Sequence, residues 1–193
     1  DATPYDVTPA VALAAVVDHR GPLIVDLDET LYLRNSTEDY IDCASPRLLA
    51  LCLMRLLDLV KPWRWTGGDA TRDVWRVRLI QACCPWIGQR WQARVQALAA
   101  AHANRPLLAA LRARQAGGNR PVIATLGFVP IVGPLVAALG LKDAVVIAAQ
   151  LDNGADRRLH KLGMTLAVLD EDAVSRALVL TDAPEFGPGS STV

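Results

Sequence analysis

The chain has 193 residues, of which 52% are hydrophobic and 21% charged, with 20 basic and 20 acidic side chains. This length suits one well-cored domain, or one domain with a large insertion, and leaves too little chain for two full domains. The composition excludes a disordered or repetitive chain, and the zero net charge removes the general argument for nucleic-acid binding.

The neutral total hides an uneven distribution of charge. Residues 44–120 contain 13 basic and 3 acidic side chains, a net charge of +10, so the remainder of the chain carries −10. All five tryptophans fall within residues 63–91, in the basic part. Interleaved basic and aromatic side chains are typical of a helical unit with an aromatic core and a solvated basic face. The same pattern also suits binding to an anionic membrane surface or to a polyanionic substrate. Single-stranded nucleic acid ranks last as a partner, because no RNA-binding motif is present.

The cysteines and the start of the chain give an expectation about the compartment. The four cysteines show no CxxC spacing and have no histidine nearby, so they predict reduced thiols rather than a zinc site. The sequence starts at Asp1 without a basic and apolar signal segment, so we expect a cytoplasmic protein. Peripheral attachment to the inner face of a membrane is the alternative that the basic, Trp-rich part leaves open.

The first elements of the chain are a short helix and an apolar strand. Thr8 and Pro9 are residue types favoured at a helix N-cap and first helical position, so residues 1–20 are predicted to hold a lead-in helix. The run PLIVDLDETL follows at residues 22–31. Its unbroken apolar stretch indicates a central parallel strand that is covered on both faces, with acidic side chains at its carboxyl end.

A long helical segment separates this strand from the rest of the fold. Apolar residues recur at helical spacing over residues 45–60, and a second helical stretch covers residues 71–103 with an interruption at Pro85. This segment is too long to be a single crossover helix. We therefore predict an inserted, all-helical cap at residues 34–104.

The remaining chain alternates between helices and strands. A helix opened by Pro106 precedes the apolar runs PVIATL, AVVIAAQL and ALVLTD, with helical stretches between the runs. Residues 121–141 carry no charge and are long enough to cross a bilayer, but prolines and glycines divide them into a strand, a GFVP turn and a helix. The alternation predicts an α/β fold, a doubly wound, Rossmann-like parallel sheet formed by residues 21–33 and 105–193.

Polar side chains gather where the predicted strands end, and the carboxyl ends of parallel strands meet at one edge of a sheet. The side chains that end or follow a strand are Asp26, Asp28, Thr30, Thr125, Lys161 and Asp182. Converging carboxylates repel each other unless a divalent cation neutralises them, so the pattern implies Mg²⁺. One carboxylate can attack and another can exchange protons, while a hydroxyl and a lysine hold phosphate oxygens.

These motifs resemble those of the haloacid dehalogenase-like (HAD) hydrolase superfamily. LIVDLDETL is similar to its first motif, DxDx[TV], and VIATLGFVPIVGPLVAALGLKDAVV resembles the second-motif region of its phosphoserine-phosphatase-like branch. Lys161, 21 residues before Asp182, matches the third motif in placement, and LVLTD matches the start of the fourth. A narrower resemblance is to the soluble domain of this superfamily that is joined to membrane prenyltransferases of the ubiquinone-biosynthesis type.

The resemblance implies a role for each matching residue. Asp26 would be the nucleophile that forms an aspartyl-phosphate, and Asp28 would be the general acid and then the base for water. Thr125 would bind the transferred phosphoryl group, and Lys161 would neutralise charge between the phosphate and Asp26. Thr30 would brace the first loop as a further member of the phosphate-binding set.

The implied metal site is where this sequence departs from the family pattern. Mg²⁺ would be bound by Asp26, the backbone carbonyl of Asp28 and the carboxylate of Asp182. The family's fourth motif usually has a second acid, for which Glu185 is the candidate here, and the terminal GPGSSTV leaves no predicted fifth strand. Glu29 replaces the commoner glycine of the first motif, a change that active branches also carry.

We therefore expect a Mg²⁺-dependent phosphatase that hydrolyses a small phosphomonoester, with the cap selecting the substrate. One alternative is a catalytically weak domain that docks on a membrane or on a partner enzyme such as a prenyltransferase. The other is a phosphotransferase that uses the same Asp26 but passes the phosphoryl group to an acceptor other than water. Nucleic acid is not expected as a partner.

Overall fold

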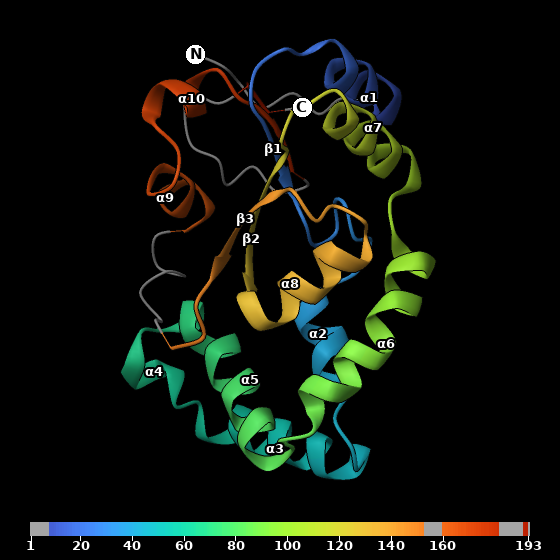
Figure 1. Cartoon of the computed structure of the whole chain (residues 1–193). Coiled ribbons are helices and arrows are strands. Elements are labelled where there is room, and N and C mark those ends of the chain that lie inside the picture. The colour runs from blue at the N-terminus through green and yellow to red at the C-terminus, as the bar shows by residue number, and fades with distance from the viewer. Residues whose placement is uncertain (1–7, 153–159, 182–190, 193) are drawn as a thin grey trace.

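The computed structural model describes residues 8–152, 160–181 and 191–192, and Figure 1 shows their arrangement. Within these residues the strands form one five-stranded sheet in the order β3-β2-β1-β4-β5, and each neighbouring pair is parallel. The strands are β1 (Leu23–Asp26), β2 (Val122–Phe128), β3 (Val145–Ala149), β4 (Leu178–Leu180) and β5 (Ser191–Thr192). The order steps outward from β1 in both directions, which confirms the predicted doubly wound parallel sheet of an α/β fold.

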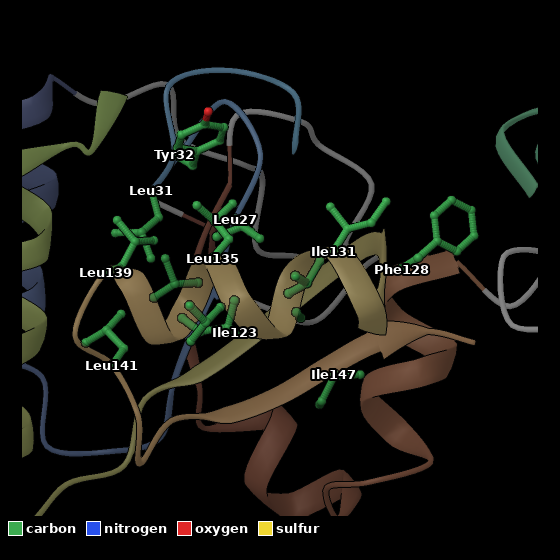
Figure 2. Close-up of a cluster of buried hydrophobic side chains, with 14 of the residues drawn as sticks. Leu27, Leu31, Tyr32, Ile123, Phe128, Ile131, Leu135, Leu139, Leu141 and Ile147 are labelled. Atoms are coloured by element: carbon green, nitrogen blue, oxygen red, sulfur yellow. The ribbon is translucent and has the colours of Figure 1, made fainter. Parts of the chain in front are cut away.

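Helices pack on the sheet from both sides. The helices outside the segment between β1 and the helix that precedes β2 are α1 (Pro9–Asp18), α7 (Arg105–Ala116), α8 (Val129–Ala138), α9 (His160–Leu166) and α10 (Glu171–Ser175). Both α8 and α9 contact β2 and β3, and Figure 2 shows them on opposite sides of β3. The lead-in helix begins at Pro9, directly after Thr8 as predicted, and packs against α7.

The segment between β1 and α7 is helical apart from its connecting turns. Its elements are α2 (Ser36–Ile41), α3 (Arg47–Val60), α4 (Trp63–Thr66), a 3-10 turn (Asp69–Thr71), α5 (Arg72–Cys83) and α6 (Ile87–His102). Figure 1 shows these helices at the end of the sheet towards which β2 runs. The indole N–H of Trp91 on α6 donates to the carbonyl of Ile131 on α8 at 3.1 Å. From here on, the helices α2 to α6 are called the cap.

The carboxyl end of β2 differs from the prediction. The sequence predicts a GFVP turn, but Gly127 and Phe128 continue the strand and α8 begins at the next residue, so the predicted turn is wrong. The register of β2 against β3 shifts between Ala124 and Phe128, and Phe128 is fully buried. The strand continues because the irregular register keeps this aromatic ring in the core.

The core lies between the sheet and its helices. Figure 2 shows one buried cluster, in which the labelled residues are Leu27, Leu31, Tyr32, Ile123, Phe128, Ile131, Leu135, Leu139, Leu141 and Ile147. All four residues of β1 are buried, as expected for a central strand. The uncharged run 121–141 is accounted for by β2 and α8, which fill this core. None of the described helices combines the length and the hydropathy needed to cross a membrane.

A short fifth strand lies beside β4. The sequence predicts that the sheet lacks it, and this prediction is wrong, because β5 pairs in parallel with Leu178 and Val179. The strand consists of two hydroxyl-bearing residues, which give no apolar run or alternation by which it could be recognised. Its formation depends on the free edge of β4 rather than on a local pattern.

Candidate active site

A buried ion pair stands at the carboxyl end of β1. Asp26 is the last residue of this strand and is only 2% exposed, and the ammonium of Lys161 on α9 donates to its Oδ2. The same oxygen accepts the hydroxyl of Thr181, which follows β4, at 3.3 Å. Oδ1 accepts the backbone N–H of Leu27 at 2.8 Å. These donors come from three different parts of the chain and fix the Asp26 carboxylate in one orientation.

A second polar pair lies two residues further along the chain. The Asp28 carboxylate accepts the backbone N–H of Ser36 at 2.7 Å and the hydroxyl of Thr125 at 3.3 Å. Thr125 belongs to β2, and its hydroxyl oxygen also accepts the N–H of Gly127 at 3.0 Å. The sequence predicted that strand ends would bring Asp26, Asp28, Thr125 and Lys161 into one neighbourhood, and the contacts place them there.

The surroundings of Asp28 change its acidity. Removal of water by the surrounding protein raises the pKa of this carboxyl, although part of the side chain is still exposed. The N–H of Ser36, the hydroxyl of Thr125 and the positive charge of Lys161 act in the opposite direction and lower the pKa, but burial is the larger effect. A carboxyl with a raised pKa is better suited to donate a proton near neutral pH than an ordinary aspartic acid.

The loop between these two pairs and the cap has an unusual backbone. Glu29 adopts a φ of 64°, the left-handed region in which glycine is favoured, and its N–H donates to the carbonyl of Tyr32 at 2.7 Å. Thr30 lies in the same loop, and its carbonyl accepts the side-chain amide of Asn104 at 3.0 Å. The amide of Asn104 therefore ties this loop to the start of α7.

Ser36 is a site residue that the sequence did not reveal. It is the first residue of α2, it is fully buried, and its N–H is one of the two donors to Asp28. Its hydroxyl also lowers the pKa of Asp28, so it lies beside this carboxylate, yet it is not aligned for a hydrogen bond with any described residue. The Asn-Ser-Thr-Glu sequence, in which Asn35 accepts the N–H of Glu38 as an N-cap, was the available signal for a helix start.

Gly127, near the end of β2, permits the close approach of Val132. A Cβ on this residue would lie 2.8 Å from a methyl group of Val132, 3.3 Å from the Thr125 hydroxyl and 3.4 Å from the Ser36 hydroxyl. The contact with Val132 is too short for any side chain to be added without movement. Glycine at this position therefore leaves room for Val132 of α8 to pack against the end of β2, beside Thr125 and Ser36.

A hydrogen-bond network anchors the base of the cap to the same loop. Asp39 on α2 accepts the phenol of Tyr32 at 2.5 Å and two N–H groups of Arg34, the shorter at 2.5 Å. Asp39 is buried, and burial together with this neighbouring carboxylate raises the pKa of Tyr32. The pairing satisfies a buried charge and holds α2 against the loop that follows β1.

The donor set suits Mg²⁺, which prefers carboxylate and carbonyl oxygens. Asp26 and Asp28 supply such oxygens, and Lys161 brings only one positive charge to these two carboxylates. Among the described residues, no three His, Cys, Asp or Glu side chains gather as a metal-binding group. The remaining predicted ligand, Asp182, and the candidate second acid, Glu185, lie outside the described residues.

Comparison with known proteins assigns the chain to a class. The family of haloacid dehalogenase-like hydrolases matches residues 23–187, so the chain belongs to this family of hydrolases, whose members generally use Mg²⁺. No curated protein matches. The fold is similar to that in the crystal structure of a protein with unknown function from Bordetella pertussis Tohama I, with a TM-score of 0.57 and 14% identity over 84% of this chain and 82% of that chain. At this identity the likeness shows the fold alone.

Proposed function

We propose that the protein is a Mg²⁺-dependent phosphomonoester hydrolase that works through a phospho-aspartate on Asp26. The observation that carries the proposal is the buried pairing of Asp26 with Lys161, beside the pairing of Asp28 with Thr125. A carboxylate held by a cation, a second carboxyl with raised pKa and a hydroxyl donor are the groups that phosphoryl transfer to aspartate requires. Membership of a hydrolase family supports the same conclusion.

The first half of the proposed reaction transfers the phosphoryl group to the protein. A carboxylate oxygen of Asp26 attacks phosphorus, and the bond between phosphorus and the substrate's alcohol oxygen breaks. Asp28 in its protonated form gives its proton to that oxygen, so the alcohol leaves as a neutral molecule. Lys161 offsets the negative charge shared by the phosphoryl group and Asp26, and the Thr125 hydroxyl donates to a phosphoryl oxygen.

The second half returns Asp26 to its starting state. Asp28, now a carboxylate, takes a proton from water while the water oxygen attacks phosphorus. The bond between phosphorus and Asp26 then breaks, and inorganic phosphate is released. The products are one alcohol and one phosphate for each substrate and water consumed, and both aspartates regain their original protonation states.

Mg²⁺ would be held by Asp26, the backbone carbonyl of Asp28 and Asp182. When bound, it supplies positive charge that lowers the repulsion between an anionic substrate and two carboxylates. The ammonium of Lys161 alone leaves an excess of negative charge among these groups. The metal requirement therefore follows from the same carboxylates that carry the chemistry.

The nucleophile is the first test. With Mg²⁺ and a generic substrate such as p-nitrophenyl phosphate, Asp26→Asn should lower turnover by at least about 10⁴-fold, because the amide cannot form the acyl phosphate. Asp42→Asn, which changes an exposed acid of the cap, is the matched control and should keep wild-type turnover. Chelation of Mg²⁺ should abolish activity. Wild-type turnover in Asp26→Asn would show that the mechanism is wrong.

The proton donor is tested separately. Asp28→Asn should lower turnover by about 10²–10⁴-fold through the loss of proton transfer, and the effect should depend on the leaving group. A substrate whose alcohol leaves without protonation should be affected less, and a burst of alcohol should then precede slow release of phosphate. Equal losses for good and poor leaving groups would contradict the assignment of Asp28 as the acid.

Two further readouts distinguish related mechanisms. Beryllium fluoride with Mg²⁺ mimics a phosphoryl group on aspartate and should raise the melting temperature of the wild type but not of Asp26→Asn. Phosphate released in equal amount to substrate consumed supports hydrolysis. Release that falls short when an alcohol is added, with a phosphorylated alcohol as product, would identify a phosphotransferase.

A further inference from the structure

Helix α3 exposes an apolar surface that nothing in the described chain covers. Of its fourteen residues only Ala50 and Leu57 are buried. Leu48 is 77% exposed and Leu59 81% exposed, and the remaining exposed large apolar side chains of the helix are Leu49, Leu51, Leu56 and Val60. Figure 1 shows α3 on the outside of the cap, at the bottom of the molecule.

Helical geometry places most of these side chains together. At about 100° per residue, six residues fall within an arc of about 120° on the side away from the buried residues. They are Leu48, Leu49, Cys52, Leu56, Leu59 and Val60. No charged residue falls within this arc. The charged residues Arg47, Arg55 and Asp58 occupy the strip along one side of it. The six residues in the arc are called the outer face of α3.

Such a face normally has a partner. A helix that is apolar on both its inner and outer sides belongs in a place where both sides are covered. Soluble domains rarely expose a contiguous patch of this kind without a binding role. The outer face takes no part in the core of the cap, because the buried residues of α3, Ala50 and Leu57, lie outside this arc.

The charges around the outer face indicate what the partner is. Arg55 lies beside the outer face on α3, Lys61 follows Val60 at the end of the helix, and Arg64 lies three residues further on. None of the three forms an ion pair with a described residue. The acid on this helix, Asp58, is paired with Arg72 at 3.0 Å. An apolar face bordered by basic side chains is the pattern of a helix that lies in the interface of an anionic membrane.

Two further features lie close to the end of α3 in the chain. Trp65 on α4 is 77% exposed, although Trp63 two residues earlier is buried. A hollow of about 520 Å³ follows the end of α3, lined by Asp58, Lys61, Trp63, Arg64, Asp69 and Arg72. Exposed tryptophan is favoured at the level of lipid headgroups. The hollow has three basic and two acidic side chains, so it adds only a small excess of positive charge toward headgroup phosphates.

We propose that the outer face of α3 docks on the surface of a membrane containing anionic lipid. The helix lies along the surface with its leucines at the boundary of the acyl chains, and Arg55, Lys61 and Arg64 contact the headgroups. A second copy of the chain is the less suitable occupant. In a two-fold interface the same basic border would face itself, with only the already paired Asp58 to offset it.

The test is binding to vesicles in the absence of substrate, so its result does not depend on the proposed phosphatase activity. The wild-type chain should co-sediment with vesicles of phosphatidylglycerol and phosphatidylcholine, but not with phosphatidylcholine alone. The double variant Leu56→Gln/Leu59→Gln should bind at least about tenfold more weakly. The matched control Val17→Gln/Val168→Gln changes two exposed apolar residues outside the cap and should bind as the wild type does.

Charge and insertion are measured separately. Replacement of Arg55, Lys61 or Arg64 by Gln should weaken binding about fivefold for each cation, and added salt should release the protein. Tryptophan fluorescence should shift to the blue on binding, and Trp65→Phe should remove most of this shift. Melting temperatures close to that of the wild type establish that each variant is folded.

Three results would overturn the proposal. The first is an absence of binding to anionic vesicles, and the second is an equal loss of binding in the control variant. The third is a dimer in solution that Leu56→Gln/Leu59→Gln converts to a monomer, which would identify a second copy as the occupant of the outer face.

Discussion

The carboxyl edge of the sheet buries charged side chains, whereas the outside of the cap exposes large apolar ones. At the sheet edge, Asp26 and Lys161 carry charges in positions that are 2% and 8% exposed. On the cap, Leu59 and Trp65 expose most of their apolar surface. Burying a charge and exposing a large apolar group are both unfavourable unless a partner compensates. In each region, the residues in these unfavourable positions are the ones for which we propose a function.

The two regions also differ in how their charges are paired. Lys161 and Asp26 form a buried pair, whereas the side chains of Arg72 and Asp58 in the cap are 47% and 45% exposed. The buried pair is held by donors from several parts of the chain, so it has little freedom to exchange with water. The exposed pair competes with solvent and ions, and pairs of this kind contribute little to stability.

The largest predicted effect comes from breaking the buried pair. Lys161→Met leaves Asp26 charged in a site with little water and should lower the free energy of unfolding by about 3–5 kcal/mol. Adding Asp26→Asn to this variant removes the second charge and should restore most of the loss. Arg72→Met should cost about 1 kcal/mol or less, including its contact 5.5 Å above the Trp63 ring. Urea unfolding of the four chains measures these values, and similar losses for Lys161→Met and Arg72→Met would contradict the comparison.

A somewhat smaller difference in stability is expected between substitutions on the inner and outer surfaces of the cap. Ile80 on α5 is fully buried, so Ile80→Ala should lower the free energy of unfolding by about 3 kcal/mol through lost contacts and a residual cavity. Leu59→Ala removes as many carbon atoms from an exposed position and should change stability by no more than about 0.5 kcal/mol. A large loss in Leu59→Ala would show that α3 is held in the fold by its outer face, and not available to a membrane.

Much of the fold follows from local sequence patterns, and the exceptions have physical reasons. Apolar runs bounded by glycine and proline locate β1 to β4 and most of the long helices. The short helix α2 has no apolar period, because Ser36, Thr37 and Asp39 are among its buried residues. The extension of β2 through Phe128 depends on an irregular register with β3. Both features are decided by neighbours that are distant in the sequence.

The residues that carry the proposed chemistry through their side chains could be predicted from the sequence, and a residue that acts through its backbone could not. Asp26, Asp28 and Thr125 could be proposed because strand ends converge in a parallel sheet. Lys161, which lies on α9, could be proposed because it follows the third strand in the chain. The N–H of Ser36 was not predictable in the same way, since any residue type supplies a backbone donor. In the cap, the sequence directs attention to the tryptophans, of which Trp63 and Trp91 are buried. The exposed leucines of α3 were not identified, because periodicity does not say which of two apolar faces the core covers.

The smallest predicted effect compares two strained residues, one beside the site and one on the cap. Glu29 has a φ of 64°, and Lys61, which ends α3, has a φ of 50°. For a residue with a side chain this backbone costs about 1–2 kcal/mol, whereas glycine adopts it freely. Glycine also makes the unfolded chain more flexible, which offsets about 0.4–1 kcal/mol. Each of Glu29→Gly and Lys61→Gly should therefore raise the free energy of unfolding by up to about 1 kcal/mol, or about 2–4 °C in melting temperature.

Alanine at the same positions keeps the strain, so Glu29→Ala and Lys61→Ala should melt at or below the wild-type temperature. The two glycine variants should differ in function despite similar stability. Glu29 is the residue directly after Asp28, and glycine there loosens the loop that positions the proton donor, so turnover should fall several-fold. Lys61→Gly removes one cation from the border of the outer face and should weaken binding to anionic vesicles about fivefold. If Glu29→Gly keeps full turnover with the same gain in stability, the left-handed residue beside the site has no part in holding Asp28.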